Sequence, residues 1–215
     1  MDQADTPDWM TPEGAGWRTR SERLVYDNPW IRLNELQAEA PTGAQTVYGL
    51  IHFKNQAIGV LPLHEDGTVT LVGQHRLPCA DYSWEIPEGG APVGTDPLEG
   101  ARRELKEETG LEASDWREVM RFQLSNSVTD EHGVGYIAMG LTQAEAEPDA
   151  TEALAVARVP FAEALDQTLC GRIRDMITLA MLLRAYHMAR EGLLPEPVAR
   201  SMLAGSLQRR GGETP

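Results

Sequence analysis

The chain has 215 residues, of which 41% are hydrophobic and 24% charged, as is usual for one globular domain with appendages. Its formal net charge of -14 argues against a general nucleic-acid-binding surface, because such surfaces are usually basic. No run of about 18 apolar residues occurs, so we expect no transmembrane helix. The N-terminus lacks the pattern of a signal peptide, which predicts a cytoplasmic protein. Cys79 and Cys170 stand in no metal-ligand spacing, so we expect neither a zinc site nor a disulfide framework.

Strand signals dominate the first third of the chain. Residues 1–17 are predicted to be a disordered tail, and residues 18–56 form a region whose apolar positions recur with a period near two. A turn signal at residues 27–29 divides this region. Further along, residues 65–67 (Glu-Asp-Gly) separate two apolar runs, which predicts a β-hairpin.

A Gly/Pro-rich loop then leads into a helix with clear start and stop signals. Asp96 suits the N-cap, Pro97 suits the first helical position, and Gly110 suits the position that ends the helix. Three acids of this helix, at positions 104, 107 and 108, share one face. Their mutual repulsion would be offset by a divalent cation, and a solvated charged face is the alternative.

The second half of the chain mixes strands and helices. Strands are predicted around residues 116–125 and 135–142, a short strand near residue 155, and helices at 161–168 and 173–190. Residues 193–215 are predicted to be a C-terminal tail with a frayed helix. Because the helices do not alternate strictly with the strands, we expect an α/β chain of the mixed α+β kind.

The loop and helix from Gly89 to Leu111 resemble the Nudix box, G-x5-E-x7-R-E-U-x-E-E-x-G-U, where U is a bulky aliphatic residue. Every fixed position matches except Thr95, which stands where the family usually has Glu. In many members that Glu is a structural partner of the box arginine, so we expect its loss to be mild. The resemblance implies a Nudix-type α/β/α sandwich with a central mixed sheet at residues 57–192. It also implies that the N-terminal β-strand extension, residues 18–56, serves dimerisation.

The box resemblance implies a magnesium site, with Mn²⁺ as the alternative ion. Carboxylates suit such hard cations, and a bound ion would reverse the local field that repels a pyrophosphate. Arg103 resembles the orienting arginine of the family. The implied metal ligands are Glu104, Glu107, Glu108 and a backbone carbonyl near Gly89.

Residues outside the box resemble the ADP-ribose and nucleotide-sugar pyrophosphatase branch. The stretches "VGQHRLP" and "SWEIPEGG" are similar to its QxR…WExPAG pattern, which implies that Arg76 contacts a phosphate and that Glu85 lies beside the metals. Trp84 is a candidate for stacking on a base or sugar, and equally for a core residue. The resemblance implies a loop glutamate as catalytic base: Glu152 is preferred, Glu131 is the second candidate, and a box glutamate such as Glu108 is a third.

The implied function is Mg²⁺-dependent hydrolysis of nucleoside diphosphate sugars to a nucleoside monophosphate and a sugar phosphate. The implied partner is a small-molecule substrate, with no nucleic acid or membrane, and the implied assembly is a homodimer. A Nudix hydrolase of another nucleotide, such as NADH or a damaged deoxynucleoside triphosphate, is the alternative within the enzymes. A non-catalytic ligand sensor is favoured less because the box carboxylates are intact. A Nudix-fold isomerase of isoprenoid diphosphates would need a catalytic cysteine and a more divergent box.

Overall fold

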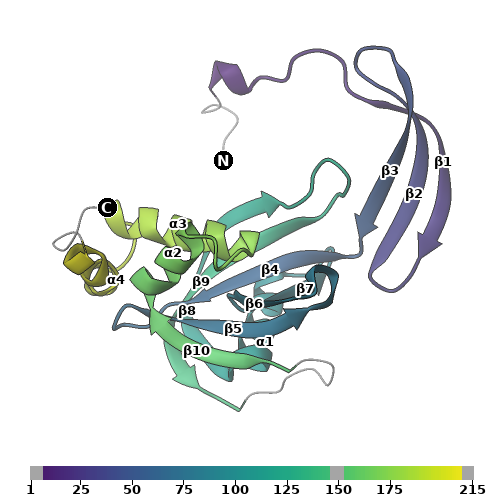
Figure 1. Cartoon of the computed structure of the whole chain (residues 1–215). Coiled ribbons are helices and arrows are strands. Elements are labelled where there is room, and N and C mark those ends of the chain that lie inside the picture. Colours follow the sequence, from purple (N-terminus) through teal and green to yellow (C-terminus); the bar gives the residue numbers. More distant parts are fainter. Residues whose placement is uncertain (1–6, 146–152, 210–215) are drawn as a thin grey trace. The chain divides into compact units, whose positions relative to one another are not determined.

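A computed structural model describes residues 7–145 and 153–209 of the chain (Figure 1). The chain divides into two compact units. The first consists of Met1–Lys54 with Ser125–Asp130, and the second of Asn55–Leu124 with Glu131–Pro215. The boundary between the units lies between residues 54 and 55, and the sequence did not indicate that Ser125–Asp130 belongs with the N-terminal unit.

The N-terminal unit is a three-stranded antiparallel sheet in the order β1-β2-β3. The predicted turn after the first strand is present: the side chain of Asn28 accepts hydrogen bonds from the backbone N–H groups of Trp30 and Ile31, at 2.9 and 2.7 Å. Asp130 joins the returning segment to this unit, since it accepts from the backbone N–H of Phe53 at 2.9 Å. Within the predicted N-terminal tail, Asp8–Met10 form a short 3-10 helix, η2. The strands are β1 (Arg18–Asp27), β2 (Ile31–Glu39) and β3 (Gln45–Phe53).

The second unit contains two sheets. One has four strands in the order β7-β4-β9-β8, and only its β4–β9 pair is parallel, which makes it a mixed sheet. The other has three antiparallel strands in the order β10-β5-β6. The strands are β4 (Asn55–Pro62), β5 (Thr68–Arg76), β6 (Asp81–Glu85), β7 (Glu88–Pro92), β8 (Leu111–Gln123), β9 (His132–Gln143) and β10 (Ala155–Pro160); a 3-10 turn, η3 (Leu77–Cys79), follows β5.

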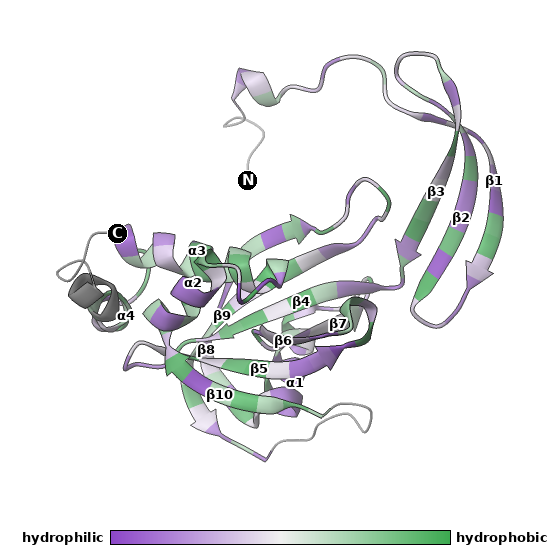
Figure 2. Cartoon of the chain, viewed as in Figure 1, coloured by the Kyte–Doolittle hydropathy of each residue, from purple (hydrophilic) through white to green (hydrophobic). Residues whose placement is uncertain are grey.

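Alternate residues of β4 and β9 face two different helical layers, as strand geometry requires. Ile58 and Val134 pack against Leu105 of α1, whereas Leu61 and Ile137 belong to the larger core that α2, α3 and α4 complete. Figure 2 shows green, apolar stretches along β4 and along the neighbouring strand β5. The mixed sheet therefore lies between helical layers, which confirms the predicted α/β/α sandwich. The helices are α1 (Pro97–Thr109), α2 (Phe161–Leu169), α3 (Met176–Arg190) and α4 (Glu196–Arg209).

The predicted hairpin at residues 65–67 is largely wrong. The turn itself is tight, with a hydrogen bond from His64 N to Thr68 O at 2.9 Å and a single bridge between Leu63 and Val69. Beyond this bridge, β4 and β5 separate into different sheets. Their partners come from distant parts of the chain, which a local turn signal does not reveal.

Residues 193–215 were predicted to be a tail, but α4 lies within this range and contributes to the core. Val198, Ala199 and Met202 are buried, and Met202 is only 1% exposed. The helix backbone also closes over Gly67, where an added Cβ would lie 2.4 Å from the carbonyl carbon of Ser201. A helix that was expected to fray is therefore held by tertiary packing.

We expect the substitution Met202→Ala to lower the free energy of unfolding by about 2–5 kcal/mol, because it leaves a cavity in the core. Urea denaturation of the full chain would measure this loss. Leu193→Ala is the matched control, because Leu193 is 52% exposed and should tolerate truncation. Equal stability of the two variants would contradict the core role of α4.

Candidate active site

The acidic face of α1 forms one wall of the site. The helix begins as predicted, with the Asp96 side chain accepting from Leu98 N at 3.0 Å, and it ends at Gly110, whose φ is 66°. Glu104 and Glu108 are buried on it, with exposed fractions of 9% and 4%. Glu107 is more open, since 37% of its side chain is exposed. The three predicted metal ligands therefore share one helical face but differ in burial.

Strand β7 holds the two buried carboxylates in place through its backbone. Glu108 Oε2 accepts a hydrogen bond from the backbone N–H of Glu88 at 3.1 Å. The Glu104 carboxylate lies directly against the Cα of Gly89, where an added Cβ would come within 2.3 Å of Glu104 Cδ. Gly89 is therefore required here for close approach of the helix, and its predicted place beside the metal ligands agrees with this packing.

Arg103 ties the same loop to the acidic face. Its Nη2 donates to the carbonyl oxygen of Gly90 at 2.7 Å and also to Glu104, while Nε lies 3.3 Å from Glu107 Oε2. The hydrogen bond to Glu104 raises the pKa of the Arg103 guanidinium, and burial opposes this in part. These contacts fit the predicted orienting role.

Thr95, the one departure from the box pattern, has a structural role in the loop. Its hydroxyl donates to Pro92 O at 2.7 Å, and its carbonyl accepts from Gln56 Nε2 at 3.1 Å. Arg103 meanwhile has partners at Gly90, Glu104 and Glu107. The box arginine is therefore anchored without an acid at position 95.

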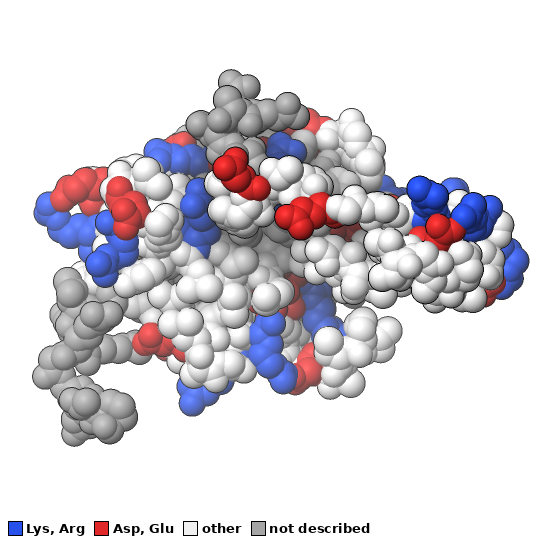
Figure 3. Space-filling view, turned by 90° about the horizontal axis from the view of Figure 1, so that it is seen from above, with Lys and Arg blue, Asp and Glu red and all other residues white. Residues whose placement is uncertain are grey.

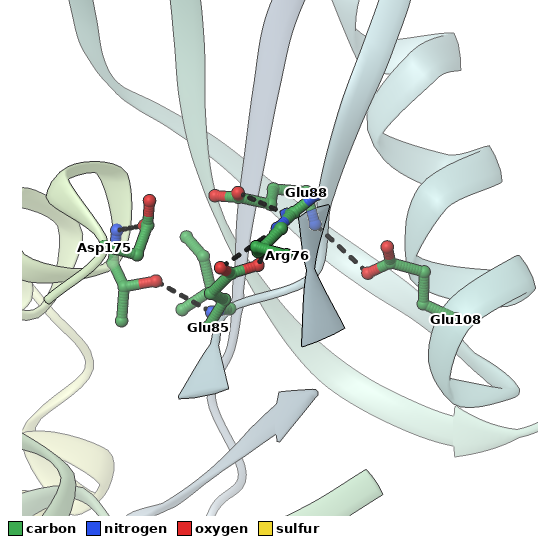
Figure 4. A network of polar contacts seen from close by, with 7 residues as sticks. Arg76, Glu85, Glu88, Glu108 and Asp175 are labelled. Carbon is green, nitrogen blue, oxygen red and sulfur yellow. Dashed lines mark hydrogen bonds and ion pairs between the residues drawn. The ribbon is translucent and has the colours of Figure 1, made fainter. Parts of the chain in front are cut away.

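A second group of charges lies around Arg76, at the end of β5 (Figure 4). Arg76 Nε is 3.1 and 3.0 Å from the two carboxylate oxygens of Glu85, and Nη2 donates to Glu85 Oε2 at 2.5 Å and to Glu88 Oε1 at 2.9 Å. The Glu85 side chain is 3% exposed and that of Arg76 is 36% exposed, so the ion pair is buried on its carboxylate side. Burial opposes the charge of Arg76, but the hydrogen bonds to Glu85 prevail and raise its pKa.

Glu88 and Asp175 complete this group, and neither was predicted as a site residue. Each of Glu85, Glu88 and Asp175 offers a carboxylate oxygen within 4.8 Å of the others. Burial, followed by the charges of Asp175 and Glu85, raises the pKa of Glu88 well above its usual value. One sequence signal was available: Glu88 stands where the WExPAG pattern has alanine.

Two cavities open onto these residues. The larger, of about 520 Å³, is lined by Arg76, Glu85, Glu88 and Asp175 among others. The smaller, of about 230 Å³, also contacts Arg76, Glu88 and Asp175, and it adds Gly89 and Glu131. The structure thus brings Glu131, one of the two loop candidates for the base, to the same cavity as Gly89.

Trp84 lies elsewhere. It is partly buried against the larger core, and its ring meets that of Tyr82 edge-on at 5.9 Å. It lines a separate cavity of about 280 Å³ with Leu71 and Val159. Glu85 follows it on β6 and so points to the other face of the strand. The packing supports the core role rather than stacking on a substrate.

Glu152, the preferred base candidate, lies outside the described residues.

The donor set fits a hard divalent cation. Glu104 and Glu108 supply buried carboxylates on α1, and oxygen ligands are what Mg²⁺ prefers. Among the described residues, the Oε2 atom of Glu88 is buried and has no hydrogen-bond partner. A cation near Glu104, Glu108 and Glu88 would offset negative charge that Arg76 and Arg103 only partly balance.

We expect Gly89→Ala to lower kcat by about 10-fold to 10²-fold, because the new methyl group would displace the Glu104 carboxylate. Steady-state kinetics would measure the loss, and the thermal unfolding midpoint would show whether the fold persists. Gly16→Ala is the control, since an added Cβ there meets nothing within 4 Å. Wild-type turnover in Gly89→Ala would contradict the close packing of Glu104 on β7.

Comparison with known families agrees with this geometry. Residues 54–179 match the NUDIX domain, and residues 17–51 match the nucleoside diphosphate sugar hydrolase N-terminal domain. Since the first match covers more than half of the chain, the chain belongs to the Nudix family. It is a Nudix hydrolase whose N-terminal sheet corresponds to the second domain family.

Individual proteins support the same assignment. An ADP-ribose pyrophosphatase of Mycobacterium tuberculosis is 27% identical over 187 residues, which cover 85% of this chain and 89% of the relative. A CMP-5'-(N-acetyl-N-hydroxy-3-aminopropyl)phosphonate hydrolase of Streptomyces rubellomurinus is 27% identical over 156 residues, covering 73% and 75%. A solved structure of an ADP compounds hydrolase superposes with a TM-score of 0.76 at 19% identity, covering 85% of this chain and 98% of that one, which shows a shared fold.

Two findings bear on partners. Within the described ranges, no helix is long and apolar enough to cross a membrane. Figure 3 shows Lys and Arg side chains interspersed with Asp and Glu on the face that it draws, rather than gathered into one basic surface.

Proposed function

We propose that this chain hydrolyses the pyrophosphate linkage of nucleoside diphosphate sugars, with ADP-ribose as the leading candidate, and uses Mg²⁺ as its cofactor. The observation that carries the proposal is the alignment of Glu104 and Glu108 by the backbone of β7, beside a cavity that Arg76 also lines. The N-terminal domain match and the ADP-ribose pyrophosphatase relative support the substrate class.

In the proposed reaction, different residues bind the metal, position the loop and attract the phosphate. Glu104, Glu107 and Glu108 would hold the metal, which when bound would polarise the phosphoryl oxygens and offset their charge. Arg103 fixes the loop of β7 against these carboxylates. Arg76 places a guanidinium at the cavity, where its charge would attract a phosphate.

The chemical step is an attack of water on one phosphorus. A new P–O bond forms, the bridging P–O bond breaks, and the departing phosphate carries its electron pair away as a nucleoside monophosphate or sugar phosphate. The proton of the attacking water passes to a carboxylate. We assign this role to Glu131, because it lines the cavity, and Glu152, which was preferred from the sequence, becomes the alternative.

A homodimer is part of the proposal, through the N-terminal sheet. All ten residues of β1 are exposed. The exposed fractions of Leu24, Tyr26 and Val47 are 55%, 53% and 59%, which is high for large apolar side chains. A second copy covering this sheet would remove these side chains from water. Light scattering of the purified chain at several concentrations would give its mass, and a monomer throughout would contradict the dimer.

A substrate panel tests the proposed activity. Purified chain with Mg²⁺ would be given ADP-ribose, ADP-glucose, GDP-mannose, UDP-glucose, NADH and 8-oxo-dGTP, and the products would be separated by chromatography. We expect a nucleoside monophosphate from one or more of the sugar nucleotides. Cleavage of only NADH or 8-oxo-dGTP would move the assignment to another Nudix substrate, and tight binding without cleavage would contradict hydrolysis of these substrates.

A further inference from the structure

Three carboxylates outside the Nudix box converge from three separate elements. Glu85 ends β6, Glu88 begins β7, and Asp175 is the N-cap of α3. Their ligand atoms lie within 4.8 Å of one another, and Figure 4 shows the Glu88 side chain extending toward Asp175. Asp175 keeps its capping bond, accepting from Thr178 N at 2.6 Å. The mutual repulsion of these carboxylates has to be offset by positive charge or by protons.

One oxygen of the Glu88 carboxylate lacks a hydrogen-bond partner among the described residues. Its Oε1 accepts from Arg76, but its Oε2 is buried and has no hydrogen-bond partner among the described residues. Only 12% of the side chain is exposed, so bulk water does not solvate it freely. A buried carboxylate oxygen without a partner is unfavourable, because it has lost its hydration and gained no hydrogen bond in return. Such an atom is therefore expected to have a ligand.

The charge balance indicates which ligand fits. Among the described residues that line the larger cavity, Arg76 pairs with Glu85 and Glu88, whereas Arg174 pairs with Asp81. With all three ionised, as they would be around a bound cation, the carboxylates of Glu85, Glu88 and Asp175 leave two negative charges that the one guanidinium does not balance. A divalent cation would balance this charge and would supply the missing partner of Glu88 Oε2. All the donors are oxygens, which favours Mg²⁺, Mn²⁺ or Ca²⁺.

We propose that Glu85, Glu88 and Asp175 form a divalent-cation site in addition to the one proposed on the acidic face of α1. The site lies on the cavity that Gly89 and Glu131 also line. If the proposed pyrophosphatase function holds, an ion held by these residues would supply positive charge to the phosphates of the substrate. The binding of the ion itself does not depend on that function.

Mn²⁺ is the probe for this site, because its free and bound forms are distinguished by electron paramagnetic resonance. The full chain would be titrated with Mn²⁺ alone, without substrate, and the bound ions counted. Glu88→Gln keeps an oxygen for Arg76 but removes the charge. Asp175→Ser removes the carboxylate but retains a good N-cap for α3. Glu65→Gln is the matched control, because Glu65 is an exposed acid in the turn after β4.

We expect each of Glu88→Gln and Asp175→Ser to lose about one bound Mn²⁺ per chain, or to weaken one binding step by 10-fold or more. Glu65→Gln should bind Mn²⁺ as the wild type does. The double variant Glu104→Gln/Glu108→Gln should lose other bound ions but keep the one that depends on Glu88. Unchanged Mn²⁺ binding in folded Glu88→Gln and Asp175→Ser would overturn the proposal. Loss of every bound ion in the α1 double variant would overturn the separation of the two sites.

This experiment is independent of the test of activity. A chain that binds the Glu88-dependent Mn²⁺ but cleaves no member of the substrate panel supports the cation site and refutes the proposed hydrolysis. In the opposite outcome, the wild-type chain cleaves sugar nucleotides, but the Glu88→Gln variant binds as much Mn²⁺ as the wild type does. That result supports the proposed hydrolysis and refutes the cation site. The two proposals therefore fail separately.

Discussion

Replacing Glu108 with glutamine is expected to lower kcat by about 10³-fold and to leave the fold intact. The carboxylate is 4% exposed and faces the cavity-lining strand β7, where it accepts from Glu88 N. Glutamine has the same shape and keeps an oxygen for that hydrogen bond, so the backbone contact survives. The charge that would hold the metal is lost, and metal stabilisation of a transition state is worth several kcal/mol, where about 4 kcal/mol corresponds to 10³-fold.

The comparison requires three measurements on the same preparations: kcat on the best substrate of the panel, the thermal unfolding midpoint, and Mn²⁺ binding. Glu112→Gln is the matched control, because Glu112 is an exposed acid just beyond the end of α1. We expect Glu112→Gln to behave as the wild type in all three. A folded Glu108→Gln protein with near-normal turnover would refute the assignment of Glu108 as a metal ligand.

Features that depend on local sequence were predicted well. The start of α1 at Pro97, its cap at Asp96 and its end at Gly110 follow from the residue types at those positions, and the structure confirms all three. The spacing of the acids likewise places Glu104 and Glu108 on one helical face. Such features involve neighbours only a few positions apart, so the sequence contains the information needed.

Features that depend on distant neighbours were missed. The hairpin prediction at residues 65–67 was largely wrong because β4 pairs with β7 and β9, and the local sequence does not predict those partners. The sequence did not predict the burial of α4, because that burial comes from packing in the larger core, against α2 and close to the turn at Gly67, which lie in earlier parts of the chain.

The same limit applies to the site. Asp175 lay within a predicted helix and was not singled out, and Glu88 was visible only as a departure from a family pattern. Their convergence with Glu85 requires β6, β7 and α3 to be in place. Burial, which leaves Glu88 Oε2 without a hydrogen-bond partner among the described residues, is likewise a property of the folded chain.

Replacing Glu131 with glutamine is expected to lower kcat by about 10²–10⁴-fold, the usual contribution of general acid–base catalysis. Glu131 lines the cavity of about 230 Å³ that Gly89 and Glu88 also line, which is the cavity where we propose that the reaction takes place. Glutamine cannot accept the proton. Because the α1 ligands are untouched, Mn²⁺ binding and KM should change little, which separates the loss of a base from the loss of the metal.

Glu152→Gln should be measured beside it, since the sequence favoured Glu152 and that residue lies outside the described part of the chain. If Glu131 is the base, Glu152→Gln retains most of the activity and the pH profile of kcat keeps its acidic limb, whereas Glu131→Gln loses that limb. A large loss of kcat in Glu152→Gln, with Glu131→Gln close to wild type, would assign proton transfer to Glu152 instead. Equal and modest losses in both would leave a box glutamate as the base, and the acidic limb would then persist in both variants.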